Sequence, residues 1–389
     1  AGMSDHQVSA PNLAELQTHH SAKWRGFPKD VLPLPVAEMD YPVAAPIRAV
    51  LAEMVANSDL GYLDSIPELG LGFQKFAAER WGWNLDPLQV RAATDVGVAV
   101  VEILRVFTKP GDSILISSPV YHNFYTWIDE TKLNKVDVPF ERTGKESKNP
   151  WEINWDGIEK AYESGIKVHL LCSPHNPLGR IYSKEELLRI VALAKQHNVL
   201  VISDEIHAPL TYKGENFLPF LALGKDAEEV GVTVTAASKG WNIAGLKCAI
   251  IVTQNENMNL RLNNLAMAMP YRASLLGGFA TAVAFSEGTE WLDAVLDNLD
   301  HNRKMIKDLL DAKLPSVKYH IPQNGYLAWL DLEALQLGKD PSATLIEKGK
   351  VAFNAGHTFG AQCSQYVRLN FATSPTIVTE AIERIARSV

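Results

Sequence analysis

Lys239 is the residue in this chain whose type and surroundings most directly suggest covalent chemistry. It lies in the stretch T-A-A-S-K-G-W-N-I-A-G-L-K-C, just after the apolar, β-branched run 230–235. A lysine at the carboxyl end of a core strand is costly to bury as an ammonium ion. Desolvation shifts it toward the neutral amine that attacks carbonyl groups. A lysine that reaches the solvent, or pairs with an acid beside a glycine turn, would explain the same local sequence.

Polar or aromatic side chains follow four predicted strands at the points where those strands end. In chain order they are Pro119 with Tyr121, Ser173 with Asn176, Asp204 with His207, and Ser238 with Lys239. In open α/β sheets, ligands bind in the crevice outside the carboxyl ends of the strands. The repeated placement predicts that these side chains meet at one edge of a sheet.

An anion site is predicted where D-V-G-V-A-V-V-E-I-L places Gly97 at the start of an apolar helix. A helix amino terminus offers free N–H groups and a favourable dipole to a phosphate. Together with a reactive amine, a ring that can stack and an acid beside a ring nitrogen, this set describes a pyridoxal phosphate site. Asp204 would keep the pyridinium cationic, and Asn176 and His207 are placed in the sequence to hydrogen-bond the ring oxygen.

Each of these residues taken singly has a plainer explanation. Asp204 could cap a helix or form a structural ion pair, and Asn176 before a proline could simply start a turn. Tyr121 could be an ordinary core or surface tyrosine. Glu205 and His207 could ligate a metal, although no second His/Asp/Glu cluster of matching spacing accompanies them, and we predict no metal. The order of the residues and their positions at strand ends make the combined interpretation specific.

Apolar runs alternate with amphipathic patterns from about residue 46 to 285, which predicts a mainly parallel sheet between helices. In one unit, a strand over 167–172 leads through the loop S-P-H-N-P-L-G-R to a helix that ends at 196. Ser183 and Glu186 form a capping box at its start. The next strand spans 199–203. Similar units surround 114–117 and 230–235.

The two ends of the chain are expected to form a second, smaller part. The proline-rich residues 1–45 predict an arm that extends over other structure. A long helix is expected over 290–314, followed by strands over 326–332 and 366–371. We therefore expect a large domain of residues 46–285 and a smaller α+β domain of 1–45 and 286–389.

Composition narrows the class of protein. The 389 residues are 47% hydrophobic and 21% charged with a net charge of −8, which favours an ordinary globular protein and gives no support for nucleic-acid binding. No apolar stretch approaches the ~18 residues that a membrane helix needs. Three widely spaced cysteines and a polar amino terminus without a signal-peptide core fit a reduced cytoplasm.

Several motifs together carry a family resemblance that runs over nearly the whole chain, from 36 to 372. They are V-A-E-M-D-Y-P, G-Y-L-D, P-V-Y-H-N-F, S-P-H-N-P-L-G, S-D-E-I-H, S-K-G-W-N-I-A-G-L-K and V-R-L-N-F-A. With them the chain resembles the fold-type-I pyridoxal-phosphate enzymes of the class I/II aminotransferase superfamily, and most of all the MalY/PatB-type cystathionine β-lyases, or carbon–sulfur lyases. The resemblance implies a mainly parallel seven-stranded sheet between helices in the large domain, and a homodimer.

The resemblance also implies roles for residues around the cofactor ring. Lys239 would hold the cofactor aldehyde as a Schiff base and later move the Cα proton of the substrate. Asp204 would pair with the pyridine nitrogen, Tyr121 would stack on the ring, and Asn176 and His207 would bind the ring oxygen. Histidine stands at position 207 where aspartate-type transaminases carry tyrosine.

Other implied roles concern the phosphate and the substrate. Backbone N–H groups of Val98 and Ala99 at the Gly97 turn, with Ser238 and Lys247, would hold the phosphate, and Tyr62 would reach the phosphate of the neighbouring subunit. Lys247 replaces the usual arginine and Ala236 the usual serine, so the phosphate contact differs from the family pattern. Arg368 would bind the α-carboxylate of an amino-acid substrate through its two-pronged guanidinium group.

The expected reaction is α,β-elimination from L-cystathionine or another S-substituted cysteine, which gives a thiol (homocysteine from cystathionine), pyruvate and ammonia. An aminotransferase for aromatic or neutral amino acids is the alternative, because both reactions begin with removal of the same Cα proton. A purely non-catalytic binding protein would be expected to lack the pair Lys239 and Arg368, which this chain keeps. The sequence leaves the natural thioether and the pathway open.

Overall fold

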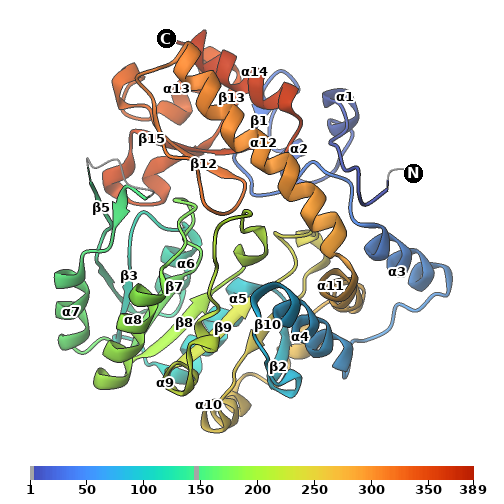
Figure 1. The fold of residues 1–389 in the computed structure, drawn as a ribbon, viewed down its shortest axis with the longest axis vertical. Coiled ribbons are helices and arrows are strands. Elements are labelled where there is room, and N and C mark those ends of the chain that lie inside the picture. Colours follow the sequence, from blue (N-terminus) through green and yellow to red (C-terminus); the bar gives the residue numbers. More distant parts are fainter. Residues whose placement is uncertain (1–3, 144–148) are drawn as a thin grey trace.

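A seven-stranded sheet forms the centre of the computed structural model, which describes residues 4–143 and 149–389. The strand order is β2-β10-β9-β8-β7-β3-β4, and β10 runs antiparallel to both of its neighbours while the other adjacent pairs are parallel. The strands are β2 (Val90–Ala93), β3 (Ser113–Ile116), β4 (Asn134–Asp137), β7 (Val168–Cys172), β8 (Leu200–Asp204), β9 (Gly231–Thr235) and β10 (Ala249–Val252). The expected mainly parallel, seven-stranded sheet is confirmed (Figure 1).

Helices cover both faces of this sheet because alternate strand residues point to opposite sides. Ile202 of β8 packs in one apolar cluster with α5 and α6, and its neighbour Val201 packs in another with α7 and α8. The helices of this part are α3 (Ala45–Ala56), α4 (Pro67–Trp81), α5 (Val96–Phe107), α6 (Asn123–Glu130), α7 (Trp155–Glu163), α8 (Lys184–His197), α9 (Lys225–Val230), α10 (Glu256–Arg261) and α11 (Leu275–Glu287). The result is the layered α/β arrangement that the alternation of patterns predicts.

Local sequence explains the unit from β7 to β8. Ser183 caps α8 by accepting from the N–H of Glu186, whose side chain in turn accepts from the N–H of Ser183, so the predicted capping box is confirmed. Asn198 ends the helix in the left-handed conformation with φ 53°. The helix and both strands lie within one or two residues of the predicted bounds.

A second, antiparallel sheet lies above the first in Figure 1, in the order β11-β12-β15-β14. Its strands are β11 (Lys318–Tyr319), β12 (Leu327–Asp331), β14 (Asn354–Ala355) and β15 (Tyr366–Asn370), and the accompanying helices are α12 (Thr289–Lys313), α13 (Pro341–Gly349) and α14 (Pro375–Ala386). The predicted long helix and both predicted strands are confirmed within one residue at each end. A separate antiparallel pair is formed by β5 (Glu141–Arg142) and β6 (Trp151–Glu152).

The amino-terminal arm is more structured than its proline content predicts. It contains two single-turn helices, α1 (Leu13–Leu16) and α2 (Ala22–Arg25). Its short strand β1 (Leu32–Pro33) pairs in parallel with β13 (Val351–Ala352) next to the second sheet. The side chain of Asn12 caps α1. One-turn helices of this kind depend on caps and packing, and the number of prolines in a segment does not predict them.

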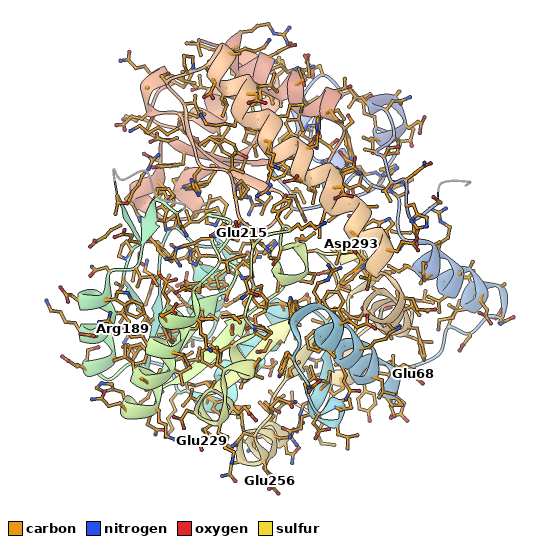
Figure 2. The ribbon with its side chains drawn as sticks, viewed as in Figure 1. Glu68, Arg189, Glu215, Glu229, Glu256 and Asp293 are labelled. Carbon is orange, nitrogen blue, oxygen red and sulfur yellow. The ribbon has the colours of Figure 1, made fainter. Side chains whose placement is uncertain are left out.

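Charged side chains lie mostly at the periphery, where several pair with each other. Arg189 contacts Glu159 at 2.7 Å and Asp293 contacts Arg80 at 2.8 Å, and all four are partly exposed (Figure 2). Such surface pairs contribute only ~0–1 kcal/mol each. Across the described ranges, no helix is both long and apolar enough to cross a membrane.

Glu205, directly after β8, is a buried carboxyl group that joins the sheet to a loop. Its Oε2 accepts from the hydroxyl of Ser203 at 2.7 Å and from the N–H of Phe220 at 3.0 Å. Burial raises the pKa of Glu205 from its usual 4.5 to about 8, although these two donors partly oppose the shift. The carboxyl group is therefore mainly protonated in the folded chain at neutral pH.

This raised pKa makes stability depend on pH. The folded chain keeps the Glu205 proton up to about pH 8, while the unfolded chain releases it near pH 4.5, so stability is lost as pH rises between these values. We expect Glu205→Gln to reduce this loss by up to ~1.4 kcal/mol per pH unit, measured by urea unfolding at several pH values. The matched change of exposed Glu68 to Gln should leave the slope as it is; equal slopes in all three proteins would contradict the prediction.

Candidate active site

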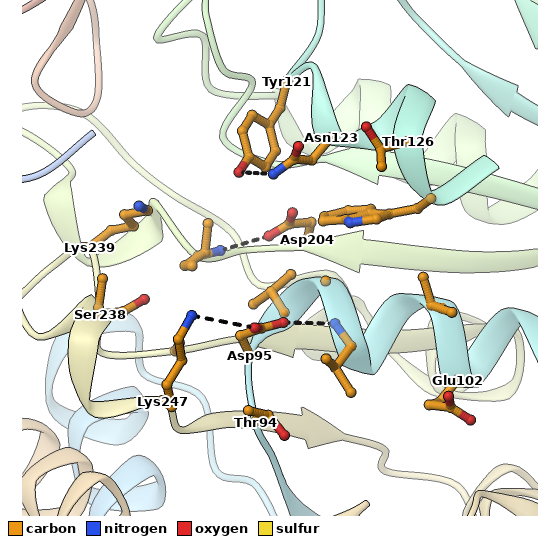
Figure 3. Close-up of a pocket in the computed structure, with 18 of the residues that line it drawn as sticks. Thr94, Asp95, Glu102, Tyr121, Asn123, Thr126, Asp204, Ser238, Lys239 and Lys247 are labelled. Atoms are coloured by element: carbon orange, nitrogen blue, oxygen red, sulfur yellow. Dashed lines mark hydrogen bonds and ion pairs between the residues drawn. The ribbon is translucent and has the colours of Figure 1, made fainter. Parts of the chain in front are cut away.

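A cavity of about 660 Å³ contains most of the residues that the sequence singled out. It lies outside the carboxyl ends of the parallel strands and beside the start of α5 (Figure 3). Nine of the twelve predicted site residues line it: Gly97, Val98, Tyr121, Asn176, Asp204, His207, Ser238, Lys239 and Lys247. The other three are Ala99, Tyr62 and Arg368.

Lys239 lies in the loop after β9, half-buried, with its amine at the cavity wall. Its Nζ donates to the carbonyl oxygen of Ala37 at 3.0 Å. Burial, and next the nearby Arg368 guanidinium, lower the pKa of Lys239 from 10.5 to about 8. A substantial fraction of the amine is therefore neutral near pH 8 and able to attack a carbonyl.

Asp204 ends β8 with its carboxylate in the cavity and only 3% of the residue exposed. Burial raises the pKa of Asp204 to about 7, while the N–H of Ile206, at 3.2 Å from Oδ1, and the charge of Lys239 act in the opposite direction. Burial likewise lowers the pKa of His207 to about 3, so its imidazole is neutral. A buried carboxyl group of this kind would be stabilised as an anion by a cationic ring nitrogen placed beside it.

Tyr121 and Asn123 lie together on one side of the cavity (Figure 3). Asn123 donates from Nδ2 to the hydroxyl oxygen of Tyr121 at 2.5 Å. The ring of Trp127 stands edge-on to the Tyr121 ring with centroids 6.0 Å apart. Sequence reasoning selected Tyr121 but not the two residues that orient it, although both follow in the same short segment.

The start of α5 forms the opposite side of the cavity. Asp95 caps the helix: its Oδ1 accepts from the N–H of Val98 at 2.8 Å, and its backbone oxygen accepts from the N–H of Ala99 at 3.0 Å. Lys247 Nζ lies 3.8 Å from the other carboxylate oxygen. A Cβ on Gly97 would stand 2.9 Å from Trp127 Nε1, so only glycine keeps this surface open. An anion bound here would compete with Asp95, a residue that sequence reasoning missed although it precedes the predicted helix.

Arg368, on β15, is buried and reaches the site from the second sheet. Its Nη1 donates to Asn176 Oδ1 at 3.2 Å and its Nη2 donates to the carbonyl oxygen of Pro35 at 3.0 Å. Its Nε is buried and has no hydrogen-bond partner among the described residues. Burial lowers the pKa of Arg368 to about 10, so the group stays cationic at neutral pH. A buried cationic donor without a partner fits the binding of a carboxylate.

Two predicted residues are placed differently from the rest. Tyr62 is 98% exposed and does not line the cavity of its own chain, so a role at a phosphate requires a second copy. Ala99 is fully buried within α5, and its N–H already serves the helix. Ser238 is half-buried at the cavity wall beside Lys239.

The residues present fit a ligand with an aldehyde, a cationic ring nitrogen and an anionic group. They supply a partly neutral amine in Lys239 and a buried carboxyl group in Asp204. They also supply a helix start at Gly97 with Lys247 beside it, where an anion would compete with the Asp95 cap. Arg368 adds an unpaired cationic donor for a second, carboxylate-bearing molecule. The arrangement can therefore do covalent chemistry on an amino acid.

Known proteins are similar to this chain over nearly its whole length. The sequence profile of the family described as aminotransferase class I and II matches residues 29–385. The chain is 35% identical to the cystathionine beta-lyase of Corynebacterium glutamicum over 97% of this chain and 98% of that protein. It is 30% identical to the cystathionine beta-lyase PatB of Bacillus subtilis, with 92% of each covered. The structure of cystalysin from Treponema denticola, which contains a pyridoxal 5′-phosphate cofactor, superposes with a TM-score of 0.89 at 26% identity over 99% of this chain and 98% of that one.

The pKa of Lys239 can be tested without any enzymatic turnover. In protein free of added ligands, the acetylation rate of Lys239 is measured against pH by competitive labelling and peptide mass spectrometry. The rate should reach half of its maximum near pH 8, with exposed Lys348 as the internal reference. Arg368→Met removes a nearby positive charge, which favours the ammonium form, so the midpoint should rise. A midpoint that does not move would mean that Arg368 does not act on the amine.

Proposed function

Because this chain belongs to the class I and II aminotransferase family, we propose that it is a pyridoxal-phosphate-dependent carbon–sulfur β-lyase. It would cleave L-cystathionine or another S-substituted cysteine, with one water consumed, to a thiol, pyruvate and ammonia. The observation that carries the proposal is a half-buried amine, that of Lys239, at the cavity wall, with the buried guanidinium of Arg368 near enough to lower its pKa. The Nε of Arg368 has no hydrogen-bond partner among the described residues and could donate to a substrate carboxylate. The name cystathionine beta-lyase on full-length relatives at 30–35% identity supports elimination over the alternative, transamination.

The proposed roles of the cavity residues follow from their chemistry. Tyr121 would lie against the cofactor ring, Asp204 would face the ring nitrogen, and Asn176 and His207 would face the ring oxygen. The phosphate would lie at the start of α5, at Gly97 and Val98, with Ser238 and Lys247 alongside. It would compete with the Asp95 carboxylate for the N–H of Val98, whereas the N–H of Ala99 is held by the backbone oxygen of Asp95. When bound, the cofactor supplies an electron sink for the pair that remains at Cα after deprotonation.

The chain itself would bind, orient and deprotonate the substrate. The guanidinium of Arg368 would bind the α-carboxylate through its free Nε. This contact would orient the substrate so that its Cα–H bond points toward Lys239. The neutral amine of Lys239 would then remove the Cα proton. If Cβ carries sulfur, the Cβ–S bond breaks as the Cα=Cβ bond forms, and the departing thiolate takes up a proton. Without such a leaving group, the same start leads to transamination.

We also propose a homodimer in the cytoplasm, with the large domain at 46–285 and the small domain at 1–45 and 286–389. Large apolar side chains that are unusually exposed support an additional interface, among them Tyr62 at 98% and Met267 at 90%. Tyr62 would contribute to the phosphate site of the second copy. The small-molecule substrate would reach a cavity that both copies border.

The reaction can be tested by pyruvate release from L-cystathionine with cofactor-loaded protein and no added keto acid. We expect multiple turnovers with one free thiol per pyruvate. Lys239→Ala should lose the imine absorption band and nearly all turnover, by roughly 10²–10⁴-fold or more, because the base is gone. Exposed Lys348→Ala is the matched control and should behave like the unsubstituted protein.

Other outcomes of this assay would decide between the reactions. Turnover of an amino acid that depends on added keto acid, with no pyruvate from any S-substituted cysteine, would establish transamination. An unchanged absorption band in Lys239→Ala would move the covalent attachment to another lysine.

Arg368→Ala should weaken substrate binding and orientation. Loss of a charge-assisted contact is expected to lower kcat/KM by about 10- to 100-fold, mostly through KM. Arg80→Ala, which removes an exposed guanidinium paired with Asp293, is the control and should leave kcat/KM unchanged. Wild-type kinetics in Arg368→Ala would exclude Arg368 from the substrate site.

A further inference from the structure

A segment of the amino-terminal arm, residues 35–42, contributes Ala37 to the cavity wall, and we call this segment the strap. Four successive strap carbonyls accept hydrogen bonds from side chains of the site and its neighbourhood. The pairs are Arg368 Nη2 to Pro35 at 3.0 Å, Asn370 Nδ2 to Val36 at 2.7 Å, Lys239 Nζ to Ala37 at 3.0 Å, and Asn370 Nδ2 to Glu38 at 2.6 Å. The strap thus contacts both groups that the proposed reaction needs.

These contacts make the strap a spacer between Lys239 and Arg368. Lys239 lies in the loop after β9 and Arg368 on β15, more than a hundred residues apart in the sequence. Their side chains nevertheless bind carbonyls only two residues apart, on Ala37 and Pro35. Two residues of extended chain span about 7 Å. A shift of the strap along its own direction would therefore move the acceptors of the amine and of the guanidinium together.

The Lys239 loop holds the strap from a second side. Asn242, three residues after Lys239, accepts from the N–H of Met39 at 3.0 Å and donates to the carbonyl oxygen of Tyr41 at 3.0 Å. Asn242 has φ 58°, the left-handed conformation that asparagine tolerates. The side-chain amide of Asn242 therefore hydrogen-bonds the backbone of the residues immediately before and after Asp40.

Asp40 is fixed by two consecutive residues of α2. Lys23 Nζ donates to Asp40 Oδ2 at 2.9 Å, and Trp24 Nε1 donates to Oδ1 at 3.0 Å. The side chains of Lys23 and Asp40 are each only 1% exposed. The Asp40 N–H also donates to the carbonyl oxygen of Ala372 at 2.9 Å, close to β15.

A buried ion pair seldom stabilises a fold more than a well-packed apolar pair would, but it can fix register. Asp40 stands between Met39 and Tyr41, neither of which carries a carboxylate. If the strap moved by one residue, Met39 or Tyr41 would face Lys23, and the buried ammonium would have no carboxylate partner. The cost of an unpaired buried charge makes such a slip unfavourable.

We propose that the Lys23–Asp40 ion pair is a positioning pair for the reaction: it fixes the register of the strap and with it the placement of Lys239 and Arg368. The inference rests on the proposed function, because it takes Arg368 as the group that binds the substrate carboxylate. Lys23 and Asp40 act through the strap and touch neither substrate nor cofactor.

The test measures binding of a carboxylate that cannot react. The probe is 3-(methylthio)propanoate, an S-substituted cysteine analogue without the amino group, and its dissociation constant for the cofactor-loaded protein is measured by calorimetry. Asp40→Asn and Lys23→Met each leave one buried charge without its partner, so both should weaken probe binding at least fivefold. The double variant, which is uncharged at both positions, should recover most of the affinity. Trp24→Phe removes a single donor and should weaken binding about twofold.

The control variant loses a buried hydrogen bond of similar kind at a place away from the strap and the cavity. Tyr162→Phe removes the buried hydrogen bond of 2.7 Å between the Tyr162 hydroxyl and His169 Nδ1 and should not change the dissociation constant. Wild-type probe affinity in the folded single variants, with only a lower melting temperature, would show a structural role and overturn the proposal. Absence of probe binding to the unsubstituted protein would overturn it as well.

The same experiment separates this inference from the proposed lyase reaction, because probe binding needs no turnover. If the unsubstituted protein binds the probe but releases no pyruvate from any S-substituted cysteine, the lyase function fails while the variants still decide the role of the ion pair. If pyruvate is released and the single variants keep wild-type affinity and wild-type KM for L-cystathionine, the positioning role fails alone.

Discussion

The burial of one lysine amine is the constraint on which the rest of the site depends. An ammonium ion loses hydration when it is enclosed, and in this chain the nearest hydrogen-bond partner of Lys239 is a neutral backbone carbonyl, that of Ala37. Arg368 adds a second positive charge nearby. Both effects favour the neutral amine, which is the form that attacks carbonyl groups and accepts protons. The surrounding fold keeps this unfavourable arrangement in place.

The seven-stranded sheet supplies that support through the ends of its parallel strands. Asp204 ends β8 and Asn176 follows β7, so two neighbouring strands bring an acid and an amide to the same edge. The second sheet contributes Arg368, whose guanidinium contacts Asn176 directly. Side chains from separate layers therefore form one polar network around the cavity, and most of its members would be costly to bury alone.

In the proposed function, elimination and transamination would share this network, since both need a group that binds the substrate carboxylate and a base at Cα. The chemistry after deprotonation depends on whether Cβ carries a leaving group, and therefore on which substrates the cavity admits. The strap forms part of the cavity wall at Ala37 and is held by Asp40, so the arm takes part in shaping the site. A segment expected only to extend over other structure thus forms part of the cavity wall.

The sequence by itself determined the strands, the capped helix that starts at Ser183, and the cluster of Lys239, Asp204 and Asn176 at strand ends. These features depend on side-chain periodicity, on caps three residues long and on the rule that parallel strands end at one edge. Only the tertiary structure decided that Lys239 donates to Ala37 and that Asp40 is buried against Lys23. Such pairings join segments far apart in the sequence, and they are selected by the packing of whole layers, which no local pattern encodes.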